Sequence, residues 1–161
     1  MTRIGLLSDT HSFFDPKLLS VFHDCDQIWH AGDIGDYRVI EQLRSIKPVI
    51  AVSGNIDDPS MRREFPDTKR FMCEDVDVLL THIGGYPGKY PSIIKPQLKV
   101  FPPKLLICGH SHICKVQYDP KYQMLTVNPG AAGKHGWHTV KTVIRFVIDQ
   151  NNIEKMEVVE W

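Results

Sequence analysis

The chain has 161 residues, a length that fits one domain able to bury a hydrophobic core without disulfide bonds. Its 19 lysines and arginines balance 19 aspartates and glutamates, which disfavours an obligatory nucleic-acid partner, because such proteins carry a basic surplus. The four cysteines form no CxxC pair, which disfavours a zinc knuckle or a thioredoxin-type redox motif and fits a reducing compartment.

The N-terminus reaches polar residues too soon for a signal peptide, and no apolar run approaches the length of a membrane span. We therefore predict a single domain over residues 1–161, a cytoplasmic location and no membrane partner.

The first elements in the chain are short apolar runs that each stop at a polar residue. The runs have the length and composition of β-strands. They cover residues 3–8, 27–31, 48–53, 76–81 and 105–108, and the polar residues that follow them are Asp9, Asp33, Asn55, His82 and His110.

Two segments between the first three runs have the spacing of helices with one apolar face. Residues 16–24 follow Asp15, which can cap the N-terminus of a helix, and residues 37–45 follow Asp36, which can do the same. Alternating strands and helices predict an α/β fold that begins with parallel strands.

The pattern changes after His112, where apolar and polar residues alternate between short turns. This alternation indicates antiparallel strands over residues 116–119, 122–127, 141–148 and 153–160. We predict an α/β (α+β) architecture of two packed, mixed sheets flanked by helices. The first half of the chain should be mostly parallel and the second half mostly antiparallel.

The polar residues after the strands are expected to meet, because ligands bind beyond the carboxyl ends of parallel strands. His11 lies two residues after Asp9, and His112 lies two residues after His110. Side chains two residues apart point to the same side of an extended segment, so each pair should deliver two groups to one place.

Together these positions supply two carboxylates, one amide oxygen and four imidazoles. Mixed nitrogen and oxygen ligands suit manganese, iron, zinc or cobalt better than calcium or magnesium. Asp33 could bridge two such ions, an arrangement that suits in-line displacement at phosphorus. The expected ligands of one metal are Asp9, His11 and His112, and those of the other are Asn55, His82 and His110.

Each of these residues also has an ordinary structural explanation when it is taken alone. Aspartate after a strand commonly begins a turn or caps a helix, and Asn55 could begin a turn. His110 and His112 behind a glycine are harder to explain without a metal. The combination of all seven favours the metal site.

Other polar residues have weaker functional signals. His30 could support a metal ligand through a hydrogen bond, or it could be a core histidine with satisfied nitrogens. The pairs Arg62-Arg63 and Lys69-Arg70 are expected to be solvated surface.

The motifs in this order resemble those of the calcineurin-like metallophosphoesterases. The matching segments are Asp9-Thr10-His11, Gly32-Asp33, Gly54-Asn55, Thr81-His82 and Gly109-His110-Ser111-His112. The short chain and Asn128-Pro129-Gly130 are similar to the small, single-domain YfcE-like phosphodiesterase branch. The resemblance implies a four-layer sandwich and a centre of two divalent metals, with manganese expected first and iron, zinc, nickel or cobalt as alternatives.

The sequence departs from the family pattern at three places. Ile56 replaces the histidine that often follows Gly-Asn and protonates the leaving group. Residues 83–85 lack a second histidine after His82, and Ala131 stands where a serine is common. The first departure resembles relatives active on phosphodiesters or activated esters rather than protein phosphatases.

The implied reaction is hydrolysis of a small phosphodiester by a hydroxide that bridges the two metals, with catalytic roles for Asp33, Asn55 and His82. His135 or His138 could act as the general acid if the loop 133–138 folds over the site, or water could serve instead, which would favour substrates with good leaving groups. Lys134 could bind a phosphate oxygen.

A rival interpretation is a catalytically weak or inactive scaffold. A eukaryotic retromer subunit is similar in fold and binds proteins, but its ligand set is incomplete, whereas all seven positions are filled here. The expected partner is a small phosphorylated substrate, and strands within residues 143–159 could pair across a homodimer.

Overall fold

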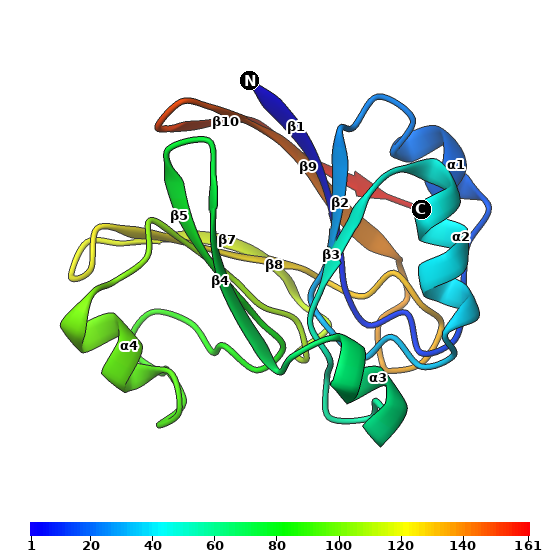
Figure 1. The fold of residues 1–161 in the computed structure, drawn as a ribbon, viewed down its shortest axis with the longest axis horizontal. Coiled ribbons are helices and arrows are strands. Elements are labelled where there is room, and N and C mark those ends of the chain that lie inside the picture. The colour runs from blue at the N-terminus through cyan, green and yellow to red at the C-terminus, as the bar shows by residue number, and fades with distance from the viewer.

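The computed structural model describes residues 1–161 and contains two five-stranded sheets (Figure 1). The first sheet has the order β10-β9-β1-β2-β3, and the second has the order β4-β5-β6-β8-β7. The strands of the first sheet are β1 (Thr2–Leu7), β2 (Gln27–His30), β3 (Val49–Ala51), β9 (Thr142–Asp149) and β10 (Asn152–Glu160). Those of the second are β4 (Thr68–Cys73), β5 (Val76–Thr81), β6 (Leu105–Ile107), β7 (Cys114–Asp119) and β8 (Met124–Pro129).

Both sheets are mixed, as the sequence predicted. Strands β1, β2 and β3 are parallel, while β9 and β10 join that sheet in antiparallel fashion. In the second sheet β5, β6 and β8 are parallel, and β4 and β7 are antiparallel edge strands. The antiparallel pairing predicted for the second half holds between β7 and β8, while the parallel pairing of β8 with β6 was not predicted. The hairpin formed with β7 turns the chain back, so β8 runs beside β6 in the same direction.

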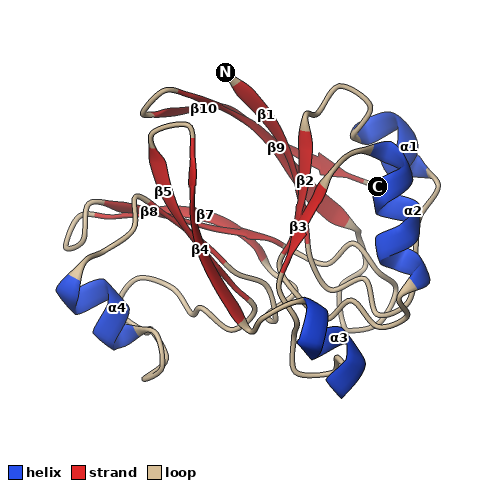
Figure 2. Cartoon of the chain, viewed as in Figure 1, coloured by secondary structure: helices blue, strands red, loops and turns tan.

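Four short helices connect the strands and complete the layers. They are α1 (Lys17–Val21), α2 (Arg38–Ile46), α3 (Pro59–Glu64) and α4 (Lys95–Val100). Figure 2 shows α1 and α2 beside the first sheet and α4 beyond the second, with the two sheets between them. The predicted α/β sandwich of two mixed sheets flanked by helices is confirmed.

The capping aspartates predicted for the first two helices lie at the helix starts. Asp15 Oδ1 accepts a hydrogen bond from the Lys17 N–H (3.0 Å), and Asp36 Oδ1 accepts one from the Arg38 N–H (2.9 Å). Helix α1 is shorter than the predicted segment because the chain leaves it in a turn that ends at Cys25 N–H···O=C Phe22 (3.1 Å).

Three apolar cores separate the layers. Leu80 and Trp29 lie in the core between the sheets, Phe22 lies between the first sheet and α1–α2, and Leu79 lies beneath α4. The neighbours Leu79 and Leu80 point to opposite faces of β5, and both faces are covered. This explains why the central strands are continuous apolar runs rather than alternating ones.

Three elements were not predicted from the sequence: β4, α3 and α4. Arg70, expected on a solvated face, lies in β4 and pairs with Asp77 of β5. Helix α3 carried a readable signal, because the Asp58 carboxylate caps it by accepting from the Met61 N–H (2.8 Å) and Pro59 is its first residue.

Strand β10 is the one element of the segment 143–159 that has a free edge, because β9 pairs with strands on both sides. Its register shifts between Glu154 and Glu157, and Lys155 has a positive φ of 53°. Bulges and lysines on an edge strand disfavour pairing with a second chain. The homodimer remains a prediction.

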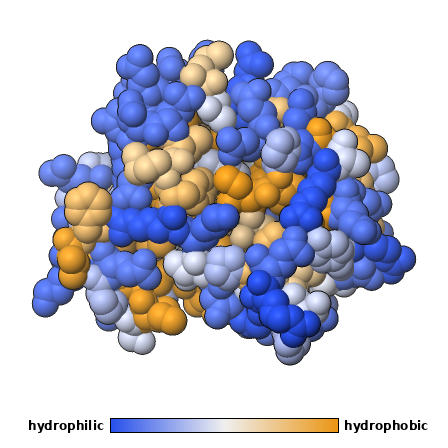
Figure 3. Space-filling view, viewed as in Figure 1, coloured by the Kyte–Doolittle hydropathy of each residue, from blue (hydrophilic) through white to orange (hydrophobic).

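The surface is mixed in polarity. Figure 3 shows apolar residues gathered between the two sheets on one face, with hydrophilic residues over most of the rest. None of the helices has both the length and the apolar composition needed to cross a bilayer.

Candidate metal centre

The carboxyl ends of parallel strands from both sheets meet in one cluster of loops. The Asp9 N–H donates to the Gly32 carbonyl (3.0 Å), which joins the loops after β1 and β2. The Gly109 N–H donates to the His82 carbonyl (2.9 Å), which joins the loops after β6 and β5. The His110 N–H then donates to Asp9 Oδ2 (3.1 Å) and links the two sheets.

The first predicted ligand group comes together at this junction. Ligand atoms of Asp9, His11 and His112 all lie within 4.8 Å of one another. Asp9 Oδ1 is 3.1 Å from His112 Nε2 and 3.8 Å from His11 Nε2. Asp9 is fully buried, so its carboxylate forms the floor of the group.

The second predicted group lies beside the first. Ligand atoms of Asp33, His82 and His110 lie within 4.8 Å of one another, and Asn55 Oδ1 is 3.1 Å from His110 Nδ1. Asp33 Oδ2 is 3.2 Å from His82 Nε2 and also 3.4 Å from His11 Nε2 of the first group. This single oxygen therefore faces both groups.

Three buried atoms at the centre have no hydrogen-bond partner: Asp9 Oδ1, His11 Nε2 and His82 Nε2. A buried polar atom without a partner is costly, so natural proteins rarely leave several together. Carboxylate oxygens and imidazole nitrogens that converge without partners fit divalent transition-metal ions. The residues therefore suit the metals that their chemistry predicted.

The carboxylates of the centre are held in their ionised form, which is the form that binds a metal. His82 Nδ1 donates to the Ala31 carbonyl (2.8 Å), which orients the ring with Nε2 toward Asp33. Burial raises the pKa of Asp33, but the adjacent His82 imidazole and the Ile56 N–H outweigh burial, so the pKa falls below its ordinary value. The pKa of Asp9 is lowered in the same way: burial raises it, and His11 and His82 outweigh burial.

The backbone that presents the ligands differs from the sequence prediction. Asp-x-His and His-x-His were expected on extended segments, but five of the seven residues have left-handed backbone conformations. Their φ angles are 54° at Asp9, 44° at His11, 54° at Asp33, 70° at His110 and 60° at His112. Asp, Asn and His tolerate this region better than most residues, and strained backbone of this kind clusters at functional sites. Tight turns, not strand alternation, direct these side chains inward.

Asp57 positions two ligand loops and was not identified from the sequence. Its carboxylate is buried and accepts three backbone N–H groups: Ile34 (3.1 Å), Gly35 (2.8 Å) and Gly54 (2.7 Å). These bonds hold the loop after Asp33 against the loop that carries Asn55. The signal in the sequence was an aspartate three residues after Gly54, which is also the pattern of an ordinary turn.

Arg62 supports the same loop. It lies on the surface, as predicted, but its Nη2 also donates to the Gly54 carbonyl (2.7 Å) and its Nε donates to the Asp57 carbonyl (3.0 Å), which the sequence did not indicate. Its side chain is 37% exposed, so the guanidinium works at the boundary of the protein rather than free in solvent.

His30 supports the loops that carry the aspartate ligands. Its Nδ1 accepts from the Gly32 N–H (3.1 Å), so its Nε2 carries the proton and donates to Thr10 Oγ1 (2.9 Å). Thr10 in turn donates to the Ile34 carbonyl (3.0 Å). Burial lowers the pKa of His30 to about 4, so the ring is neutral under ordinary conditions.

We expect the metal-free protein to lose stability as the pH falls from 6.5 to about 4. In this window His30 is protonated in the unfolded protein but stays neutral in the folded protein. The unfolded state therefore becomes more favourable as the pH falls. Urea unfolding followed by circular dichroism across the window should show this slope. The His30→Gln variant should show a smaller slope, and equal slopes in the two proteins would contradict the assignment.

Asn128, part of the Asn-Pro-Gly segment, holds the loop that carries His110 and His112. Its Nδ2 donates to the Gly109 carbonyl (2.8 Å) and to Ser111 Oγ (3.1 Å). Its Oδ1 accepts from the Gly130 N–H (2.9 Å). The segment thus has a positioning role that explains its place in the motif set.

The loop 133–138 lies over the first ligand group. The His135 ring is 4.7 Å from the His11 ring, measured between centroids. His138 Nε2 donates to the Gly133 carbonyl (2.7 Å), which closes the loop on itself. Lys134 Nζ lies over the Phe13 ring, 4.2 Å from its centroid, rather than over the centre.

A family model for the calcineurin-like phosphoesterase superfamily domain matches residues 2–151. The chain belongs to the calcineurin-like phosphoesterase superfamily. The resemblance seen in the motifs is therefore confirmed. Members of this superfamily use divalent metals, and the two groups of converging side chains are its candidate metal sites in this chain.

Two relatives of this chain are archaeal proteins. A protein named "Probable metallophosphoesterase" from Methanothermobacter thermautotrophicus is 29% identical over 133 residues, which cover 80% of this chain and 76% of the relative. A protein of the same name from Methanocaldococcus jannaschii is 30% identical over 139 residues, which cover 80% of this chain and 67% of the relative.

Solved structures share the fold of this chain along nearly its whole length. Vps29 from Chaetomium thermophilum has a TM-score of 0.77 at 16% identity, covering 100% of this chain and 98% of its own. A novel archaeal phosphodiesterase has a TM-score of 0.74 at 22% identity, covering 98% of this chain and 99% of its own. At these identities the likeness establishes the fold alone.

Proposed function

We propose that the protein is a hydrolase of small phosphodiesters that works with two divalent metals, and that residues 1–161 act as one phosphoesterase domain. The observation that carries the proposal is the position of Asp33 Oδ2, 3.4 Å from His11 Nε2 and 3.2 Å from His82 Nε2. One carboxylate oxygen that serves two ligand groups is the arrangement that a pair of adjacent ions requires. When bound, such ions lower the pKa of water and place positive charge beside the phosphate oxygens.

The residues of the site hold the predicted ligands in place and leave one side open to the substrate. Asp9, Asp33 and His82 are buried and held by backbone contacts, which keeps the floor of the centre rigid. Asn55 and His110 are exposed, so the second group is open to a substrate from solvent. In-line attack requires the phosphate to be held in one position, and ligands that are fixed in place with one side open to solvent can do this.

A diester is favoured over a phosphoprotein because the chain lacks a histidine next to Asn55. Ile56 occupies that position, is 46% exposed and has no proton to donate. We assign the proton donor to His135, which lies beside His11 on the loop 133–138. A proton donor at this position matters most for esters whose leaving group is poor, because good leaving groups need less protonation.

The balanced charge of the chain supports a small substrate. With 19 basic and 19 acidic residues the surface offers no excess charge for a long polyanion, and the positive charge would come from the metals. Manganese is our first choice for both sites because the family resemblance implies it and carboxylate ligands suit it; iron, zinc, nickel and cobalt come next.

The test is a hydrolysis panel of the purified protein with each of these metals. We expect bis-p-nitrophenyl phosphate to be hydrolysed faster than p-nitrophenyl phosphate, and manganese to stimulate the reaction. Metal content should be measured in parallel and should approach two ions per chain. Binding of metals with no hydrolysis of any ester would favour the scaffold interpretation instead.

The same panel separates His135 from the metal ligands. The His135→Ala variant should hydrolyse a diester with a poor leaving group, such as methyl phenyl phosphate, about a hundredfold more slowly than the parent. Its rate on bis-p-nitrophenyl phosphate should change little. Equal losses on both substrates would show that His135 has a structural role only.

A further inference from the structure

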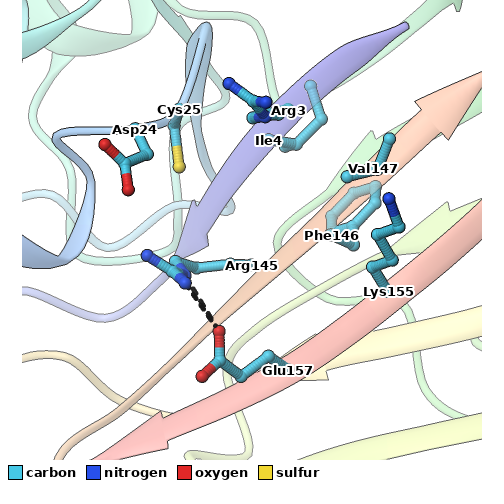
Figure 4. Close-up of a pocket in the computed structure, with 9 residues that line it drawn as sticks. All are labelled: Arg3, Ile4, Asp24, Cys25, Arg145, Phe146, Val147, Lys155 and Glu157. Atoms are coloured by element: carbon cyan, nitrogen blue, oxygen red, sulfur yellow. Dashed lines mark hydrogen bonds and ion pairs between the residues drawn. The ribbon is translucent and has the colours of Figure 1, made fainter.

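Three cavities differ in how they connect to the metal centre. One, of about 350 Å³, is lined by Arg145 and Glu157, which pair with each other across β9 and β10 (Figure 4). A second, of about 330 Å³, is lined by Tyr86 and Ile113. Neither is lined by a predicted metal ligand.

A third cavity, of about 190 Å³, opens on the second ligand group and includes Asn55 and His82 in its walls. Ile83, directly after His82, and Ile93, on the segment before α4, provide its large apolar side chains. We call this space the isoleucine cavity. We propose that it binds one compact apolar group of the substrate, a single aromatic ring or a short alkyl chain esterified to the phosphate. This inference rests on the proposed phosphodiesterase function.

Apart from the predicted ligands Asn55 and His82, the polar side chains that line the isoleucine cavity are paired with one another. Ser53 Oγ donates to Asp67 Oδ1 (2.9 Å), and the hydroxyls of Thr68 and Thr81 are hydrogen-bonded (3.2 Å). Arg62 pairs with the same Asp67 carboxylate. A polar substrate group would have to break these bonds, whereas an apolar group need not, so the cavity selects for apolar chemistry.

The isoleucines are unusually exposed for their type. Ile83 is 43% exposed and Ile93 is 73% exposed. Covering them with a substrate group removes apolar surface from water and favours binding. Because they lie beside Asn55 and His82, a substrate group that covers them would be next to the proposed phosphate site.

The size of the isoleucine cavity limits what it can take. An apolar cavity of about 150 Å³ accommodates benzene, whereas pockets for drug-sized ligands begin at about 300 Å³. At about 190 Å³ the isoleucine cavity fits one ring with a small substituent but not a whole nucleoside. The substrate class is therefore a diester with at least one small aryl or alkyl alcohol.

The test compares phenylphosphonate with methylphosphonate, which present the same acid group with and without a ring. Calorimetric titration of the zinc-loaded protein should show about tenfold tighter binding of phenylphosphonate. The Ile83→Ser and Ile93→Ser variants should each reduce this ratio toward one. Ile113→Ser is the matched control, because Ile113 also follows a ligand and is 65% exposed but lies in the second cavity.

Methyl NMR gives a readout that does not depend on metals or on hydrolysis. Phenol added to the metal-free protein should shift the δ1-methyl signals of Ile83 and Ile93 and leave that of Ile113 in place. Such shifts without any ester hydrolysis would overturn the proposed function, but they would still show that the isoleucine cavity binds an aromatic ring. Hydrolysis together with equal binding of the two phosphonates, or shifts at Ile113 alone, would overturn the cavity.

Discussion

The Asp33→Asn variant should hydrolyse bis-p-nitrophenyl phosphate at least about a thousandfold more slowly than the parent protein. Loss of a residue that merely supports a ligand costs about tenfold to a hundredfold in metal affinity or activity, and Asp33 faces both ligand groups directly. An amide oxygen carries no charge with which to hold two cations at once. The measurement is kcat at saturating manganese, with bound metal determined by mass spectrometry.

The fold should survive this substitution. Asp33 Oδ1 accepts from the Ile56 N–H (3.1 Å), and the amide oxygen of the asparagine introduced by Asp33→Asn can accept the same bond. Asp75→Asn is the matched control, since Asp75 is exposed in the turn between β4 and β5, away from the ligand ends of the strands. Full activity with two ions bound in Asp33→Asn would exclude Asp33 as the bridging residue.

The Asp57→Ala variant should lower the free energy of unfolding by about 3 to 5 kcal/mol, because it leaves three backbone N–H groups without their acceptor. Those of Ile34 and Gly54 are buried, and a buried donor without a partner keeps its full desolvation penalty. Alanine also releases the Asn55 loop from the Asp33 loop, so manganese should bind about tenfold to a hundredfold more weakly. Urea unfolding of the metal-free protein and manganese titration give the two quantities.

Asp58→Ala provides the comparison, because it removes the neighbouring carboxylate. Asp58 caps α3 through one hydrogen bond to the Met61 N–H, so its loss should cost about 1 kcal/mol and leave manganese affinity unchanged. Equal destabilisation by the two variants, or unchanged metal affinity in Asp57→Ala, would mean that Asp57 does not position the ligand loops.

Much of the fold was predictable because its main signals are local. The strands β1, β2, β5 and β6 are apolar runs covered on both faces, and such runs need no knowledge of their neighbours to be recognised. Strand β4 was not predicted because its polar residues are typical of a solvated surface segment. The ion pair of Arg70 with Asp77 on β5 is visible only in the folded protein. The parallel pairing of β8 with β6 joins residues far apart in the chain, which periodicity does not report.

The candidate site was also predictable in part: its residues could be named from the sequence, but their geometry could not. Its seven residues could be named because five strands end in ligand types, and the structure brings all seven together. The reason given for their geometry was wrong, because the left-handed turns at Asp9 and His110 depend on contacts across the two sheets. Asp57 looked like a turn residue because its three partners lie in two separate loops.

By itself, the sequence determined which side chains stand at the strand ends and which chemistry they offer, since residue type and strand length are local properties. Only the tertiary structure decided that Asp33 faces both ligand groups, that Asp57 joins their loops, and that a cavity containing Ile83 and Ile93 adjoins Asn55 and His82. The physical reason is that loop conformation is set by hydrogen bonds between residues distant in the chain, and a one-dimensional pattern does not contain those distances.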